Sequence, residues 1–178
     1  MSTFGSLVVI TVDISDSPDT QRTEKTLHGI TESTRLARIA AAALYENRVS
    51  ADVLFSGSTP NTVEARDIVL ENTRRLPRET TEDVGLDLES SAPLGGRHWL
   101  RLKSLIDEQL LPALAHGDTV FVIGSPLAVE WIDSQLPGDG NHPGERVCIP
   151  GYPVVFTFDR DFNLQDSRRL AQKRQRGE

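Results

Sequence analysis

Short polar residues follow the apolar runs of this sequence, and they are the first candidates for chemistry. Thr11, Asp13 and Ser15 come after the run "LVVI" at residues 7–10. Similar side chains follow the runs that end at Phe55 and at Ile123: Ser56, Ser58, Asn61 and Ser125. If the three runs are parallel strands, their carboxyl ends meet at one edge of a sheet, where open α/β folds bind ligands. We therefore expect one crevice that collects these residues.

Asp13 is the candidate general acid or base of that crevice. A carboxyl group in a partly dry pocket can exchange protons with a substrate, because burial raises its pKa toward neutrality. Its alternative role is to bind the backbone of its own loop, as Asp commonly does. Uncharged groups would hold the substrate: Thr11, Ser15, Ser56, Asn61 and Ser125. Such a pocket suits a small, neutral organic molecule.

Among the four histidines, His98 is the one that we expect beside the crevice, and its neighbour Trp99 could stack on a ligand. Cys148 is the single cysteine and has no evident activating partner. The sequence contains no tight His, Cys and Asp spacing of a metal site. It also lacks the Gly-Lys-Ser/Thr of a nucleotide-binding loop. We expect neither a metal nor a cofactor.

Apolar periodicity predicts the elements that position these residues. Helical spacing occurs in residues 30–48, 59–76, 98–117 and 127–136. A last strand is expected within 152–161, antiparallel and near an edge, whereas residues 77–98 read as irregular. Alternating strands and helices predict a three-layer α/β/α sandwich with a mostly parallel sheet. We place this single domain at residues 1–165 and a polar, flexible tail at 166–178.

Composition and charge narrow the function classes. The chain has 178 residues and a formal charge of −7, from 19 basic and 26 acidic residues. This balance argues against a general binder of nucleic acid or of anionic membranes. The apolar run at the start is too short to span a bilayer. With one cysteine, a cytoplasmic location is the simplest expectation, with a small organic molecule as partner and a homodimer as a candidate assembly.

Three segments resemble the histidine phosphatase superfamily, whose fold is phosphoglycerate-mutase-like. "LVVITVDIS" is similar to the first strand of that family, with Thr11 and Val12 where the family has Arg-His. "FSGSTPNTVEARDIV" is similar to the second strand and helix, with Asn61 where an Arg falls. "VFVIGSPLAVEWI" places Ser125 where the family has its second His. The resemblance covers nearly the whole chain.

The departures from the family pattern concern the residues that carry its chemistry. In the family, the first His forms a phosphohistidine, and two Arg with the second His neutralise the phosphate. The four matching positions hold Thr11, Val12, Asn61 and Ser125. Val12 cannot act as a nucleophile, and none of the four is a cation. The family carboxylate corresponds to Asp87 or Glu89 in "GLDLESS", and the spacing leaves both open. We expect no phosphatase or mutase activity by the phosphohistidine mechanism.

Two functions remain open. One is an enzyme that performs cofactor-free acid–base chemistry on a small phosphate-free molecule, such as isomerisation, cyclisation, dehydration or hydrolysis, with Asp13, Glu89 and His98 as catalytic candidates. An Ala- and Arg-rich composition associates it with the specialised metabolism of high-GC bacteria. The other is a catalytically inactive pseudoenzyme that binds a ligand or a protein. The latter would need an exposed apolar patch, and the sequence shows no obvious one.

Overall fold

The computed structural model describes residues 4–13, 32–136 and 149–172. In these ranges six strands form one sheet in the order β3-β2-β4-β1-β5-β6. Neighbouring strands from β3 to β1 are parallel, and β5 and β6 are antiparallel additions. The strands are β1 (Gly5–Thr11), β2 (Val53–Ser56), β3 (Glu79–Glu82), β4 (Thr119–Gly124), β5 (Val154–Phe158) and β6 (Leu164–Arg169).

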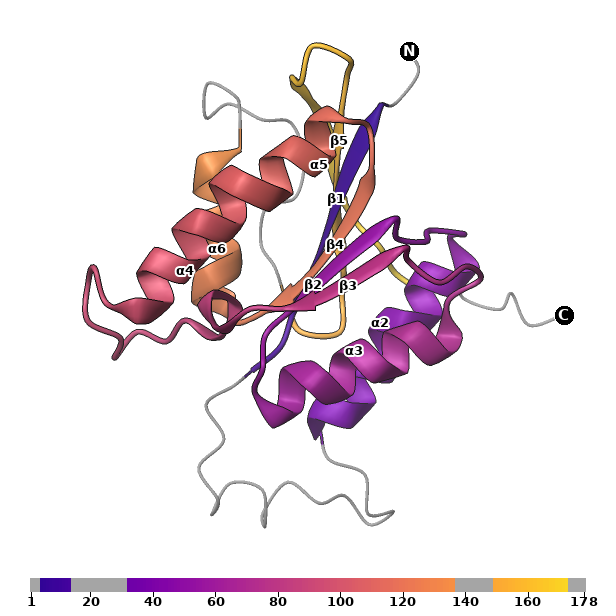
Figure 1. Cartoon of the computed structure of the whole chain (residues 1–178). Helices are drawn as coiled ribbons and strands as arrows, with labels where there is room; N and C mark the ends of the chain where they lie inside the picture. The colour runs from indigo at the N-terminus through magenta and orange to yellow at the C-terminus, as the bar shows by residue number, and fades with distance from the viewer. Residues whose placement is uncertain (1–3, 14–31, 137–148, 173–178) are drawn as a thin grey trace, which may run out of the picture.

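Helices cover both faces of this sheet (Figure 1). One face carries α2 (Glu32–Glu46) and α3 (Pro60–Asn72). The other carries α4 (Arg97–Leu105), a π-helical turn (Ile106–Leu110), α5 (Leu111–Ala115) and α6 (Pro126–Gln135). A 3₁₀ turn, η1 (Val84–Asp87), leads from β3 toward α4. The predicted α/β/α sandwich with its mostly parallel sheet is confirmed.

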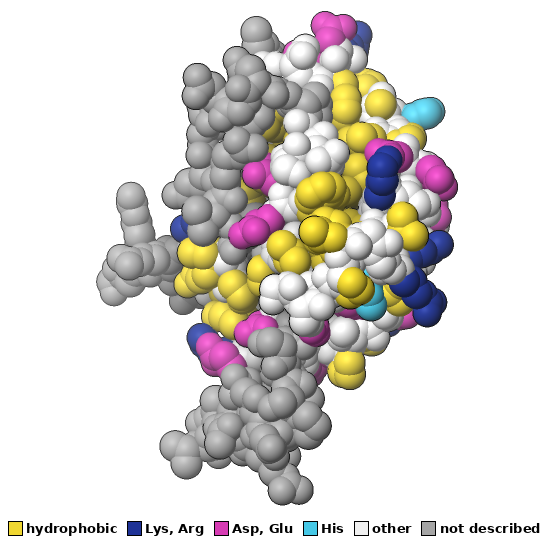
Figure 2. Space-filling model, turned by 90° about the vertical axis from the view of Figure 1, so that its left-hand side faces the viewer, with side chains coloured by type: hydrophobic (Ala, Val, Ile, Leu, Met, Phe, Trp, Pro, Cys, Tyr) yellow, Lys and Arg dark blue, Asp and Glu magenta, His cyan; other side chains and the backbone are white. Residues whose placement is uncertain are grey.

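The outer surface of the α4–α6 layer carries exposed apolar side chains. Leu94, Leu100 and Trp131 expose 87%, 62% and 37% of their surface. Figure 2 shows this face, with hydrophobic side chains gathered across its middle. The expectation that the chain lacks an obvious apolar patch is therefore wrong. Spacing along single helices did not reveal the patch, because it forms only where two helices lie together.

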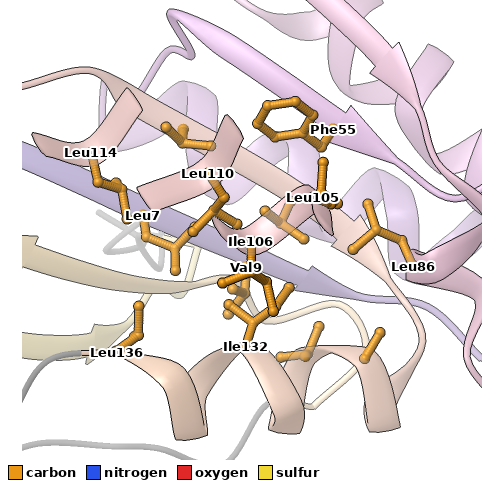
Figure 3. Close-up of a cluster of buried hydrophobic side chains, with 14 of the residues drawn as sticks. Leu7, Val9, Phe55, Leu86, Leu105, Ile106, Leu110, Leu114, Ile132 and Leu136 are labelled. Carbon is orange, nitrogen blue, oxygen red and sulfur yellow. The ribbon is translucent and has the colours of Figure 1, made fainter. Parts of the chain in front are cut away.

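Strand alternation divides the core into two halves. Leu7 and Val9 of β1 point toward α4–α6, whereas Val8 and Ile10 point toward α2 and α3, because successive side chains of a strand face opposite sides. The α4–α6 half buries Leu105, Ile106, Leu110 and Leu114 against Phe55 and Val9 (Figure 3). Each fully buried leucine contributes about 2 kcal/mol of hydrophobic free energy.

Two strands differ from the sequence prediction. β3 lies in the segment read as irregular, because its residues Glu-Thr-Thr-Glu are nearly all exposed at the sheet edge and show no apolar alternation. β6 includes residues 166–169, which were assigned to the tail. It buries only Ser167 among its six residues and forms the other edge. The last predicted strand, β5, is antiparallel as expected, and it lies next to that edge.

The helix predicted at 98–117 is interrupted. Its middle, Ile106–Leu110, has π-helical geometry. Pro112 follows this turn, and it lacks the N–H that would bond to the carbonyl of Glu108, while its ring crowds that carbonyl. A π turn accommodates such a defect without ending the helix. The apolar side therefore stays turned to the core, with Ile106, Leu110 and Leu114 all buried.

An ion pair at the amino-terminal edge of the sheet gives a pH prediction. Arg78 donates from Nη1 and Nη2 to the Oδ1 and Oδ2 atoms of Asp118 at 2.9 and 2.5 Å. These hydrogen bonds lower the pKa of Asp118 below its ordinary value. The pair therefore stabilises the fold above the ordinary pKa of an Asp, and this stabilisation is lost as pH falls toward the lower folded pKa.

We expect the free energy of unfolding of the wild type to fall more steeply than that of Asp118→Asn between about pH 5 and pH 3. Urea titrations at several pH values measure both curves. Arg78→Ala should show the same shallower dependence as Asp118→Asn. Parallel curves for wild type and Asp118→Asn would show that the pair does not contribute.

Candidate functional site

Two crevices lie at the carboxyl ends of the parallel strands, and both are lined by Glu89. The smaller has a volume of about 270 Å³ and is bounded by Asp13, Leu88, Glu89, Ser90, Ser125, Pro126 and Leu127. The larger has about 380 Å³ and is bounded by Ser58, Thr59, Asp87, Glu89, Ser91, Ala92, Pro93 and His98. The three predicted catalytic candidates, Asp13, Glu89 and His98, thus surround adjoining space.

The position of Glu89 follows from the turn η1 before it. Asp83 accepts a hydrogen bond from the Gly85 N–H at 2.8 Å and so caps this turn. Leu86 and Leu88 are fully buried, which holds the segment against the core. Ser125 adds two bonds, since its N–H donates to the Leu86 carbonyl and its hydroxyl to the Leu88 carbonyl. Glu89 is the first residue that emerges from this anchored segment, and it is exposed.

The structure separates the two carboxylates that the sequence left open. Asp87 is 7% exposed and accepts hydrogen bonds from Ser58, Thr59 and Thr62. It lies at the amino end of α3, where a carboxylate accepts hydrogen bonds from the free N–H groups and interacts favourably with the positive end of the helix dipole. Thr59 occupies the N-cap position of α3, but its side chain makes no capping hydrogen bond, and its hydroxyl bonds that of Thr62. Asp87 therefore holds the start of α3, although it also borders the larger crevice, and Glu89 is the exposed carboxylate of the two.

The proposed binding residues occupy different surroundings. Ser125 lines the smaller crevice, but its hydroxyl donates to Leu88 O and accepts from the Ala128 N–H as the cap of α6. Asn61 donates from its amide to the Asp13 carbonyl at 2.9 Å, which ties α3 to the end of β1. Thr11 borders a separate cavity of about 30 Å³ under the start of α2. Ser56 is fully buried and lines neither crevice.

The structure places Trp99 away from both crevices. Its ring contacts Trp131 edge-on, with centroids 4.9 Å apart and planes at 86°, and it packs against the core on the α4–α6 side. It lines neither crevice, because Trp99 and His98 are adjacent helical residues about 100° apart around the α4 axis. Ser15, the loop at 16–29 and Cys148 lie outside the described residues.

Ser90 and Ser91 are crevice residues that sequence reasoning did not single out. They follow Glu89 directly, in a segment rich in short polar side chains. Ser91 donates to a Glu89 carboxylate oxygen at 3.3 Å. The signal that could have found them is their adjacency to a candidate carboxylate in a polar stretch between two apolar segments.

The charge of the crevices is negative among the described residues. Their lining includes three carboxyl groups and one imidazole, and it includes no Lys or Arg from the described ranges. Arg101, on the nearby helix α4, pairs with the buried Asp83 at 2.7 Å. Within the described parts of the chain, no group of three His, Cys, Asp or Glu side chains is placed to hold a metal ion. No described helix is long and apolar enough to cross a membrane.

Solved structures with a similar architecture include histidine phosphatases and a phosphoglycerate mutase. The protein histidine phosphatase SixA, complexed with tungstate, aligns with a TM-score of 0.60 and 14% identity over 94% of this chain and 97% of that chain. The alpha-ribazole phosphatase of Shigella flexneri aligns with a TM-score of 0.56 and 13% identity over 97% of this chain and 98% of that chain. A phosphoglycerate mutase of Plasmodium falciparum aligns with a TM-score of 0.55 and 11% identity over 92% of this chain and 89% of that chain.

These similarities confirm the predicted phosphoglycerate-mutase-like fold. At such low identity they establish the fold alone. No protein-family model matches the sequence, and no curated protein matches it.

Proposed function

We propose that this chain uses the histidine phosphatase fold for chemistry without phosphate: cofactor-free acid–base conversion of a small organic molecule bound beside Glu89. The observation that carries the proposal is the lining of the two crevices. Glu89 shares one crevice with Asp13 and the other with His98. Carboxylate and imidazole groups around one space can take a proton from one atom of a substrate and return it to another.

Electrostatics supports the exclusion of phosphate esters. At about 4 Å, each unit of phosphate charge is repelled by a carboxylate with about 4 kcal/mol at the effective dielectric constant of a protein surface. The positions that resemble the family's nucleophile and cations are Val12, Thr11, Asn61 and Ser125. Val12 is buried in the α2 side of the core, and the other three are uncharged. None of them supplies the attraction that a phosphate dianion needs.

Tungstate, a tetrahedral oxyanion like phosphate, provides the first test. We expect millimolar tungstate to leave the melting temperature unchanged, and an aryl phosphate to be hydrolysed no faster by the wild type than by Val12→Ala. A histidine phosphatase of the same fold serves as the positive control for both assays. Stabilisation by tungstate together with hydrolysis of the aryl phosphate would overturn the proposal.

A phosphate-free compound library, screened by thermal shift, tests the crevice directly. Compounds that stabilise the wild type should stabilise Glu89→Gln less, because the variant loses the carboxylate that both crevices share. Glu108→Gln is the matched control, since it removes an exposed carboxylate on the π turn. Equal stabilisation of wild type and Glu89→Gln by every hit would place the binding site elsewhere.

The second candidate is a catalytically inactive protein-binding module. The exposed apolar surface of α4 and α6 favours it, because monomeric soluble proteins rarely expose a large contiguous apolar patch. Turnover of any library hit by the wild type, lost in Asp13→Asn or His98→Asn, would decide for the enzyme. Absence of turnover for every hit, together with loss of protein association in Trp131→Ser, would decide for the module.

A further inference from the structure

The apolar surface on the outer layer has a defined centre. We call it the Trp99–Trp131 face, made of Trp99, Leu100, Leu127 and Trp131. The edge-on contact between the two indole rings links α4 to α6. Leu127 and Trp99 are partly buried against the core, whereas Leu100 and Trp131 remain exposed. Aromatic side chains such as these contribute most of the binding energy where proteins associate.

Charges of opposite sign flank this face on its two helices. Helix α4 exposes Arg97, Arg101 and Lys103, and α6 carries Glu130 and Asp133. In Figure 2 acidic side chains adjoin the hydrophobic centre on the left, and Lys and Arg side chains lie to its right. The Trp99–Trp131 contact fixes the relative height of the helices. Lys103 lies one turn beyond Trp99 on α4, and Glu130 directly precedes Trp131 on α6, with Asp133 further around that helix. The basic group therefore flanks the aromatic centre along α4 and the acidic group flanks it along α6.

We propose that a second copy of this chain docks on the Trp99–Trp131 face, related by a two-fold axis that runs along the two helices. A two-fold interface must be complementary to itself. Rotation about this axis places α4 of each copy over α6 of the other, so that basic side chains meet acidic ones around the buried aromatic centre. A partner with a surface of one sign would instead be repelled by one half of the face.

The internal pairs of the basic side chains do not prevent this docking. Lys103 bonds Asp107 at 2.7 Å, but both side chains are at least half exposed and lie one helical turn apart. Such surface pairs contribute only about 0.3–0.5 kcal/mol, so Lys103 can bind a second carboxylate. Arg97 has no hydrogen-bond or ion-pair partner in the described part of the chain. The two indoles line neither crevice, and Leu127 is the residue of this face that also borders the smaller one. The association can therefore be tested without any assay of the proposed reaction.

Sedimentation equilibrium of the full chain measures the expected association. We expect a dimer with a micromolar dissociation constant, and an increase of that constant by about 30-fold in Trp131→Ser, the loss typical of a hot-spot residue. Leu76→Ser removes an exposed leucine after α3 and should leave the dimer unchanged. Circular dichroism and melting temperature verify that both variants fold. A wild type that stays monomeric up to about 100 μM, or a dimer unaffected by Trp131→Ser, would overturn the proposal.

Charge reversal tests the arrangement of the two copies. One variant carries Arg97→Glu and Lys103→Glu, which makes α4 acidic, and a second carries Glu130→Lys and Asp133→Lys, which makes α6 basic. The dissociation constant of each variant alone should be about tenfold higher than that of the wild type, because like charges then face each other at both contacts. An equimolar mixture should recover wild-type association, since α4 of each variant then faces an oppositely charged α6. If both variants are folded and the mixture dissociates like its components, α4 does not lie over α6.

Discussion

Gly85→Ala is expected to lower the free energy of unfolding by about 3 kcal/mol, the upper range for overpacking in a rigid site. A methyl group at this position would lie 2.4 Å from the Leu102 nitrogen and 2.6 Å from its Cα atom. Both neighbours are helix backbone, so no side chain can rotate away, and α4 would have to move off η1. Denaturant titration measures the loss.

Gly95→Ala is the matched control for this substitution. Gly95 has a φ of +73°, and a methyl group there meets no atom within 4 Å. The control therefore carries only the strain of a left-handed residue, about 1 kcal/mol. A loss for Gly85→Ala no larger than that of Gly95→Ala would show that α4 and η1 can separate freely.

Asp87→Ala is expected to lower the free energy of unfolding by about 3 kcal/mol, because it leaves the N–H and hydroxyl donors of Ser58 without their acceptor inside the protein. The Ser58 N–H and hydroxyl both donate to Oδ2, at 2.6 and 2.8 Å, and Thr62 donates to Oδ1 at 3.3 Å. Asp87→Asn should cost less, since its amide oxygen still accepts. Thermal and urea unfolding of the three proteins give this order.

Glu89→Gln provides the contrast, because Glu89 is exposed only two residues away. We expect its stability to stay within about 0.5 kcal/mol of the wild type. The two carboxylates would then have different roles: loss at Asp87 destabilises the fold, and loss at Glu89 changes only ligand binding. A large destabilisation by Glu89→Gln would make it a second structural carboxylate.

The structure of segments with a periodic apolar pattern could be predicted from the sequence. The structure of segments that depend on partners distant in the chain could not. The strands that contain Ile10, Phe55 and Ile123 could be predicted because they are runs of β-branched and aromatic residues, which are buried in the structure. β3 has no such pattern, because this polar edge strand is stabilised by its pairing with β2 and not by burial of its own side chains. The apolar spacing at 98–117 predicted one uninterrupted helix, and the π turn at Ile106–Leu110 was missed because it depends on how the helix packs against the core.

The candidate site shows the same division. Strand ends indicated that Asp13 and Ser125 would meet, and both line the smaller crevice. The sequence could not show that the Ser125 hydroxyl is used by Leu88, 37 residues earlier in the chain. Nor could it separate Asp87 from Glu89, since burial of the former depends on the loop at 57–59. Gly57 leaves room for that carboxylate, because a Cβ atom there would lie 2.0 Å from its oxygen.

The polar borders of the sheet determine how these molecules can meet at high concentration. If two β3 edges approached each other, Glu79 and Glu82 of both copies would bring four carboxylates into one ladder. The opposite border, β6, presents Gln165, Asp166 and Arg168 to solvent. Charged edges discourage the strand-to-strand addition that begins fibrous aggregates. The charged edge strands thus disfavour the addition of strands from other molecules. At high concentration, reversible contacts between molecules are therefore expected at the helical surfaces.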